Sequence, residues 1–221
     1  MIYSKNASMY FDGTIAKSRK NFMKQLTRKL NLAEPDRPLV FLCIGSDRAT
    51  GDCLGPLVGQ SLLQYTDKQG SAHSFGSFFL NAHPEDPCRQ KKAVVYGSLQ
   101  HTVHAGNLDT ILNHIQNCYF HPYVVAIDAS LGIPEHVGFV TLGDGCLHPG
   151  IGVDRYLPEA GDIHITGIVN RSSRQNALSL QTTNLSTVMQ LSAFIADGIC
   201  ETLHVRPSLQ RPQKRHFINI F

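Results

Sequence analysis

Two aspartates in one glycine-rich loop are the residues of this sequence best suited to chemistry. The segment FLCIGSDRATGDCLGP, residues 41–56, carries Asp47 and Asp52 just after an apolar run stops. Such loops often bind phosphate, but a dinucleotide fingerprint needs glycine at its first, third and sixth positions, and only Gly45 fits. A P-loop needs lysine after its last glycine, and Asp52 follows Gly51. Two carboxylates would also repel a phosphate, so the loop is not predicted to bind a nucleotide.

A third aspartate, Asp128, directly follows the apolar run at residues 123–127, which is typical of a strand buried on both faces. If this strand and the one at 39–44 are parallel neighbours, Asp128 emerges at the same edge as Asp47 and Asp52, where α/β sheets build their sites. Each aspartate taken alone is typical of a turn. Two carboxyl groups close together share a proton, so that one can activate water while the other protonates a leaving group.

With a histidine, the same carboxylates would form a site for a divalent metal ion instead. The candidate histidines are His101 and His104, in the loop after the second strand, and His148. A surface or turn role is the commoner one for histidine, so the metal and metal-free interpretations both stay open. Nucleophilic mechanisms are disfavoured, because the sequence has no GxSxG elbow and the charge of Asp52 opposes a thiolate at Cys53.

Strands alternate with helices in the pattern of apolar residues. Strands are predicted at 39–44, 93–97, 123–127, 137–142 and 163–169, and helices at 15–31, 54–65, 106–117 and 184–203. This order predicts a three-layer α/β/α fold around a mostly parallel sheet.

The chain divides into an N-terminal helical extension at 1–38, a single α/β domain at 39–205 and a basic tail at 206–221. Within the domain, residues 67–92 are predicted to be an insertion, because they far exceed the usual connection of about 4–6 residues.

Composition limits the classes of function. The chain has 221 residues, of which 42% are hydrophobic and 17% charged, as expected of a globular protein. The net charge of +3 comes with no basic face, so no nucleic-acid partner is predicted. The six cysteines include no CxxC pair, and no apolar run reaches the length of a membrane span. These features predict reduced thiols, no membrane association and a cytoplasmic location; the oligomeric state is left open.

Five ordered blocks carry a family resemblance: IGSDRATGDCLGPLVG, VYGSLQHTVHAGNL, AIDASLG, HPGIGVDRYLP and GDIHITGIVN. Together they resemble the YyaC family of sporulation proteins, which is similar to the germination protease of spores and to the hydrogenase maturation endopeptidases. The resemblance implies their α/β fold and a paired-aspartate peptidase site. The two aspartates correspond here to Asp52, in GDCLGP, and Asp128, in IDAS. The HPGIGV turn implies that His148, Gly150 and Gly152 lie near the same edge.

The leading hypothesis is a spore-associated peptidase that needs no cofactor and uses Asp52 and Asp128 as its acid–base pair. Asp47, His148 and Gly150 are expected to orient a protein or peptide substrate. The resemblance implies spore proteins as substrates and the forespore or spore core as the location. One alternative is a metal-binding protein or metallohydrolase with a divalent ion on Asp52, Asp128 and His101. Another is a sporulation factor that has no catalytic activity.

Overall fold

A computed structural model of the chain describes residues 8–32, 37–68, 93–150 and 157–205. Residues 69–92 of the predicted insertion and the predicted tail lie outside them. The described strands are β1 (Met9–Asp12), β2 (Leu39–Cys43), β3 (Ala93–Tyr96), β4 (Tyr123–Gly132), β5 (Phe139–Asp144) and β6 (Ile163–Arg171). The α-helices are α1 (Ala16–Leu32), α2 (Leu54–Lys68), α3 (Leu108–Cys118), α4 (Asn176–Gln181) and α5 (Leu185–Val205).

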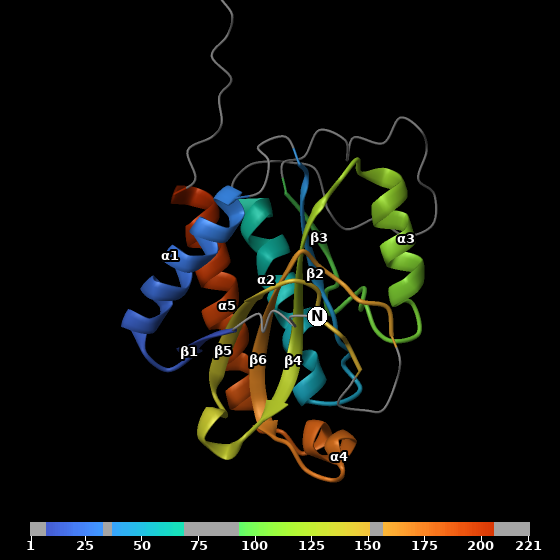
Figure 1. The fold of residues 1–221 in the computed structure, drawn as a ribbon. Helices are drawn as coiled ribbons and strands as arrows, with labels where there is room; N and C mark the ends of the chain where they lie inside the picture. The colour runs from blue at the N-terminus through green and yellow to red at the C-terminus, as the bar shows by residue number, and fades with distance from the viewer. Residues whose placement is uncertain (1–7, 33–36, 69–92, 151–156, 206–221) are drawn as a thin grey trace, which may run out of the picture.

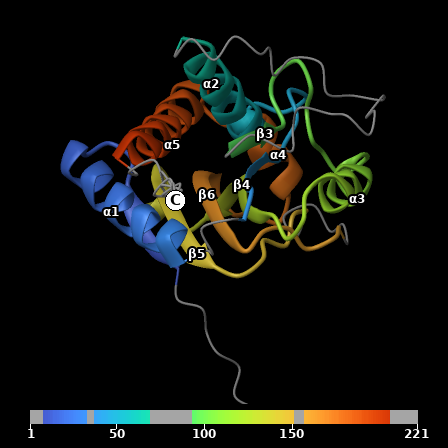
Figure 2. The same cartoon turned by 90° about the horizontal axis from the view of Figure 1, so that it is seen from above.

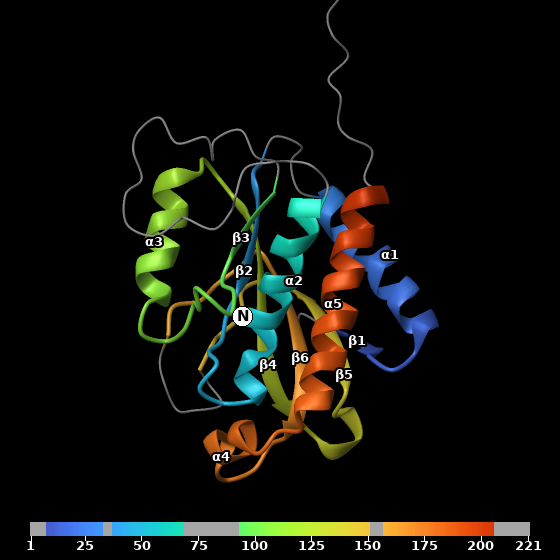
Figure 3. The same ribbon diagram turned by 180° about the vertical axis from the view of Figure 1, so that it is seen from behind.

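The six described strands form one mixed sheet in the order β1-β5-β6-β4-β2-β3. The strands β6, β4, β2 and β3 are parallel, while β5 and β1 run antiparallel at the other side of the sheet. Helices α1, α2 and α5 cover one face and α3 covers the other (Figures 1 and 2). Seen from behind, α2 and α5 lie in front of the sheet and run along its strands (Figure 3). The predicted α/β fold with a mostly parallel sheet is therefore confirmed.

The inner strand β2 is buried on both faces, as its continuous apolar run predicts. Leu39, Phe41 and Cys43 pack in the core beneath α1, α2 and α5. Val40 and Leu42 face the other way and pack in the core beneath α3. Because successive side chains alternate between the two faces, this one strand joins both cores.

Two strands differ from the sequence prediction. The strand predicted to end at 127 continues to Gly132, because β6 pairs with it beyond that point, with one register shift between Ser130 and Leu131. Asp128 therefore lies inside β4, opposite Thr166, and not in a turn after the strand. The segment 1–38, expected to be helical only, also contributes β1, which pairs with β5 at the edge of the sheet.

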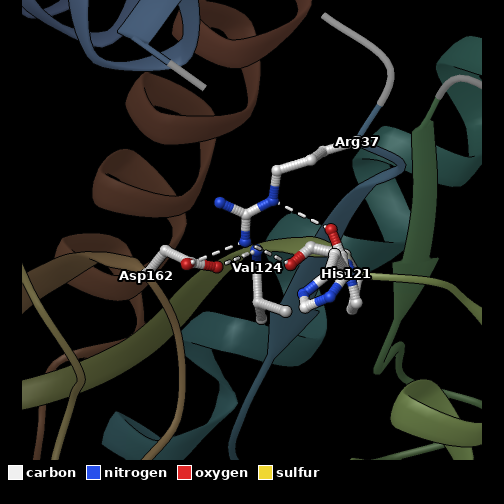
Figure 4. Close-up of polar contacts among 5 residues, drawn as sticks. Arg37, His121, Val124 and Asp162 are labelled. Atoms are coloured by element: carbon white, nitrogen blue, oxygen red, sulfur yellow. Dashed lines mark hydrogen bonds and ion pairs between the residues drawn. The ribbon is translucent and has the colours of Figure 1, made fainter. Parts of the chain in front are cut away.

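Arg37 joins the amino ends of the neighbouring strands β2 and β4 (Figure 4). Its Nε donates to the carbonyl oxygen of His121 at 2.8 Å, and its Nη2 donates to that of Pro122 at 2.8 Å. Nη2 also lies 3.0 Å from Oδ1 of Asp162, whose Oδ2 accepts the backbone N–H of Val124 at 2.7 Å. These contacts fix where β2 and β4 begin relative to each other.

Helix α2 packs against the sheet at backbone contact through two glycines. A Cβ atom at Gly55 would overlap the carbonyl oxygen of Ile44, and one at Gly59 would overlap the carbonyl oxygen of Gly97. Gly97 itself has φ of +92°, a conformation that favours glycine. The helix can therefore lie against the ends of β2 and β3 only if these positions lack side chains.

Replacing Gly55 with alanine is expected to destabilise the protein, because the added methyl group must displace α2 from the end of β2. Overpacking of this kind costs about 1–3 kcal/mol of the free energy of unfolding, measurable by urea denaturation. The matched control is Ser61→Ala at an exposed position of the same helix, expected to change stability by less than about 0.5 kcal/mol. Equal stability of the two variants would contradict the close approach of α2 to the end of β2 at Gly55.

Candidate active site

A cavity of about 820 Å³ lies at the carboxyl edge of the parallel strands. Its wall comes from the loops after β2 and β3, from β4, from the segment after β5, and from α4, which lies below the ends of β4 and β6 (Figure 1). The neighbouring strands β2 and β4 connect onward in opposite directions, β2 to β3 and β4 toward β5. Such a switch point is where open α/β sheets form their binding crevices.

Asp52 reaches the cavity from a single 3₁₀ turn, Gly51–Cys53, directly before α2. Its Oδ2 accepts two hydrogen bonds from Ser46, from the backbone N–H at 2.7 Å and from Oγ at 2.8 Å. Gly45, with φ of +140°, lets the loop fold back so that Asp52 reaches Ser46. A Cβ at this position would overlap the carbonyl oxygen of Asp52. Burial raises the pKa of Asp52, while the bonds from Ser46 and the nearby His104 act in the opposite direction.

Asp128 reaches the same cavity from β4, one residue beyond Ile127, which pairs with the last residue of β2. Burial raises the pKa of Asp128 well above its ordinary value, and the negative charge of Asp52 raises it further. The N–H of Ala129, which donates to Oδ1 at 2.7 Å, lowers it only in part. The two carboxyl groups thus interact electrostatically, and Asp128 is the one that retains a proton more strongly.

Three hydroxyl groups, on β4, β6 and β5, lie on the part of the sheet around Asp128. Ser130 Oγ donates to Thr166 Oγ1 at 3.1 Å, and Thr166 Oγ1 lies 2.7 Å from Thr141 Oγ1. Ser130 and Thr166 line the cavity. This polar surface next to the carboxyl groups was not predicted from the sequence, because it depends on the pairing of β4 with β6.

Of the two histidines after β3, the structure brings His104 to the cavity. The backbone N–H of His104 donates to Asn107 Oδ1 at 2.8 Å, and its ring Nδ1 accepts the N–H of Gly106 at 3.0 Å. His101 is exposed and is not among the described residues that line the cavity. The described side chains therefore place His104, rather than the expected ligand His101, near the two carboxyl groups.

The three residues expected to orient a substrate are placed differently. His148 and Gly150 line the cavity, and His148 Nδ1 lies 3.3 Å from Glu159 Oε1. Asp47 is exposed and is not among the described lining residues. Gly152, from the same HPGIGV turn, lies outside the described residues.

Comparisons with known proteins identify a family. The sequence model of the family DUF1256, described as 'Protein of unknown function', matches residues 8–79 and 87–198. The chain is also 38% identical, over 193 residues, to the uncharacterized protein YyaC of Bacillus subtilis strain 168. That alignment covers 87% of this chain and 82% of the relative. The predicted YyaC membership is confirmed, and kinship with the germination protease stays a prediction. None of the described helices is long and apolar enough to cross a membrane.

Replacing Asp128 with asparagine is expected to stabilise the protein increasingly as the pH rises. Because the pKa of Asp128 is raised on folding, the folded chain binds this proton more tightly than the unfolded chain does. Parent stability is therefore lost from about pH 4, the ordinary range for aspartate, up to the raised pKa, and is constant above it. Asparagine cannot ionise, so the difference in free energy of unfolding between Asp128→Asn and the parent should grow over this pH window.

Urea denaturation at a series of pH values measures this difference. Asp47→Asn, which removes an exposed carboxylate from the same loop as Asp52, is the control. A gain in Asp128→Asn that does not increase with pH, or an equal gain in the control, would contradict the raised pKa of Asp128.

Proposed function

The chain belongs to the DUF1256 family, and we propose that its cavity is the active site of a peptidase that uses Asp52 and Asp128. The observation that carries this proposal is that both carboxyl groups line one cavity in unequal surroundings. Such inequality separates an acid from a base in a carboxyl pair. The likeness of the GDCLGP and IDAS segments to the germination protease supports peptide bonds, in spore proteins of a sporulating cell, as the target.

Each carboxyl group has a role that follows from its surroundings. Ionised Asp52, with its Oδ2 held by Ser46, accepts a proton from water as the water oxygen attacks the peptide carbonyl carbon. Protonated Asp128 donates its proton to the amide nitrogen as the carbon–nitrogen bond breaks. The proton gained by Asp52 and the proton lost by Asp128 balance, and exchange with solvent restores the pair.

The tautomer of His104 favours the metal-free mechanism over a metal ion on the same carboxylates. Because Nδ1 of His104 accepts the Gly106 N–H, the neutral ring carries its proton on Nε2. Metal coordination through Nε2 would require this proton to move to Nδ1, and the bond from Gly106 would be lost. As it stands, the Nε2–H can donate to a carboxylate or to a substrate carbonyl oxygen.

The activity test compares single substitutions in the full chain. Asp52→Asn and Asp128→Asn should each lower kcat/KM for cleavage of small acid-soluble spore proteins by about 100-fold or more, as loss of an acid or base does. The control is Asp109→Asn, an exposed carboxylate in the first turn of α3, which should cleave like the parent. Thermal melts confirm that each variant is folded. Full activity in either site variant would overturn the acid–base pair.

Metal content separates the alternatives. Metal bound by the aspartates would be present in the parent and lost in Asp52→Asn, whereas the metal-free pair predicts the same metal content in both. A parent chain that cleaves neither spore proteins nor a peptide library would instead support a factor without catalytic activity.

A further inference from the structure

Three side chains with metal-binding atoms converge beside the cavity and take no part in the proposed mechanism. The ligand atoms of Cys146, His148 and Glu159 all lie within 4.8 Å of one another. Cys146 Sγ donates to Glu159 Oε2 at 2.8 Å, and His148 Nδ1 lies 3.3 Å from Glu159 Oε1. One carboxylate thus bridges a thiol and an imidazole.

The backbone produces this convergence. Leu147 and Ala160 form an antiparallel bridge, with N–H to carbonyl hydrogen bonds of 2.7 and 3.0 Å in the two directions. Ala160 is buried, and Leu147 packs in the same core as α3. Since side chains alternate along an extended segment, Cys146 and His148 project to the opposite face from Leu147. Glu159, opposite His148 in the same register, projects to that face as well.

We propose that Cys146, His148 and Glu159 bind a zinc ion. A thiolate, an imidazole and a carboxylate are each established zinc ligands, and the thiolate distinguishes the set from one suited to magnesium or calcium. Ligand atoms that lie about 2.0–2.3 Å from a tetrahedral zinc ion are roughly 3.5 Å apart, near the separations found here. The two negative charges of the thiolate and carboxylate neutralise the ion.

Binding replaces the hydrogen bond between the thiol and the carboxylate. The S–H bond of Cys146 breaks, a bond from Sγ to zinc forms, and the proton passes to solvent. Three protein ligands leave a fourth coordination position for water or for an anionic group of a bound molecule. Because His148 lines the cavity, the ion would hold that wall in place. This site does not depend on the peptidase proposal and shares no residue with the aspartate pair.

The test titrates the metal-stripped full chain with cobalt(II), a coloured substitute for zinc, and then displaces it with zinc. One equivalent should bind with a thiolate-to-cobalt charge-transfer band, release a proton and raise the melting temperature. Cys146→Ser should abolish the band. Glu159→Gln, which keeps the thiol, should weaken binding by more than the roughly 10- to 100-fold that loss of an outer-sphere partner costs.

Two controls assign the site. Cys118→Ser removes a thiol whose Sγ lies 3.5 Å from His114 Nε2 on α3, with no carboxylate in that contact, and should retain the band. Combined Asp52→Asn and Asp128→Asn should also retain it. Absence of the band in the parent, its survival in Cys146→Ser, unchanged affinity in Glu159→Gln, or its loss in either control would overturn the proposal. The metal-free melting temperature verifies that each variant folds.

Discussion

The packing of α2 against the ends of β2 and β3 fixes the position of the candidate active site. Gly55 and Gly59 bring the helix backbone against the carbonyl oxygens of Ile44 and Gly97, where a Cβ would overlap them. The chain must therefore reverse within the short loop between β2 and α2, and Asp52 occupies the last turn of that loop. Because β4 pairs in parallel with β2, the same edge also receives Asp128. Helix packing, loop length and strand register together place both carboxyl groups in one cavity.

Elements with strong local patterns were predictable from the sequence, and elements that depend on distant partners were not. The apolar run of β2 and the helical spacing of α1 and α3 carry their own signal. The extension of β4 beyond Ile127 does not, because the polar and small residues there are held as a strand by pairing with β6. The four residues of β1 are likewise too few to show an alternation of apolar and polar residues. They form a strand because they pair with the edge of β5.

The same distinction applies to the site. Asp47, Asp52 and Asp128 were predictable as candidates because they follow apolar runs at an edge that parallel strands share. The resemblance carried by GDCLGP and IDAS selected Asp52 and Asp128 among them. Which of His101 and His104 lies at the cavity was not predictable, since both lie in one loop without periodicity. That choice depends on the side chain of Asn107 and the N–H of Gly106, which fix His104 at the cavity. The cluster around Glu159 depends on a bridge between two separate segments, which sequence spacing alone does not reveal.

The two carboxyl groups are anchored in different ways, and this difference limits how the site can move. Asp128 lies between residues whose backbones pair with Ile165 and Gly167 of β6, so its main chain is held by the sheet. Asp52 lies in a single turn, and its carboxylate is held by Ser46 within the same loop. Backbone movement that changes the distance between the carboxyl groups is therefore expected from the loop and not from the sheet. Since the bonds from Ser46 favour the ionised form of Asp52, loop displacement and proton uptake at this residue are coupled events.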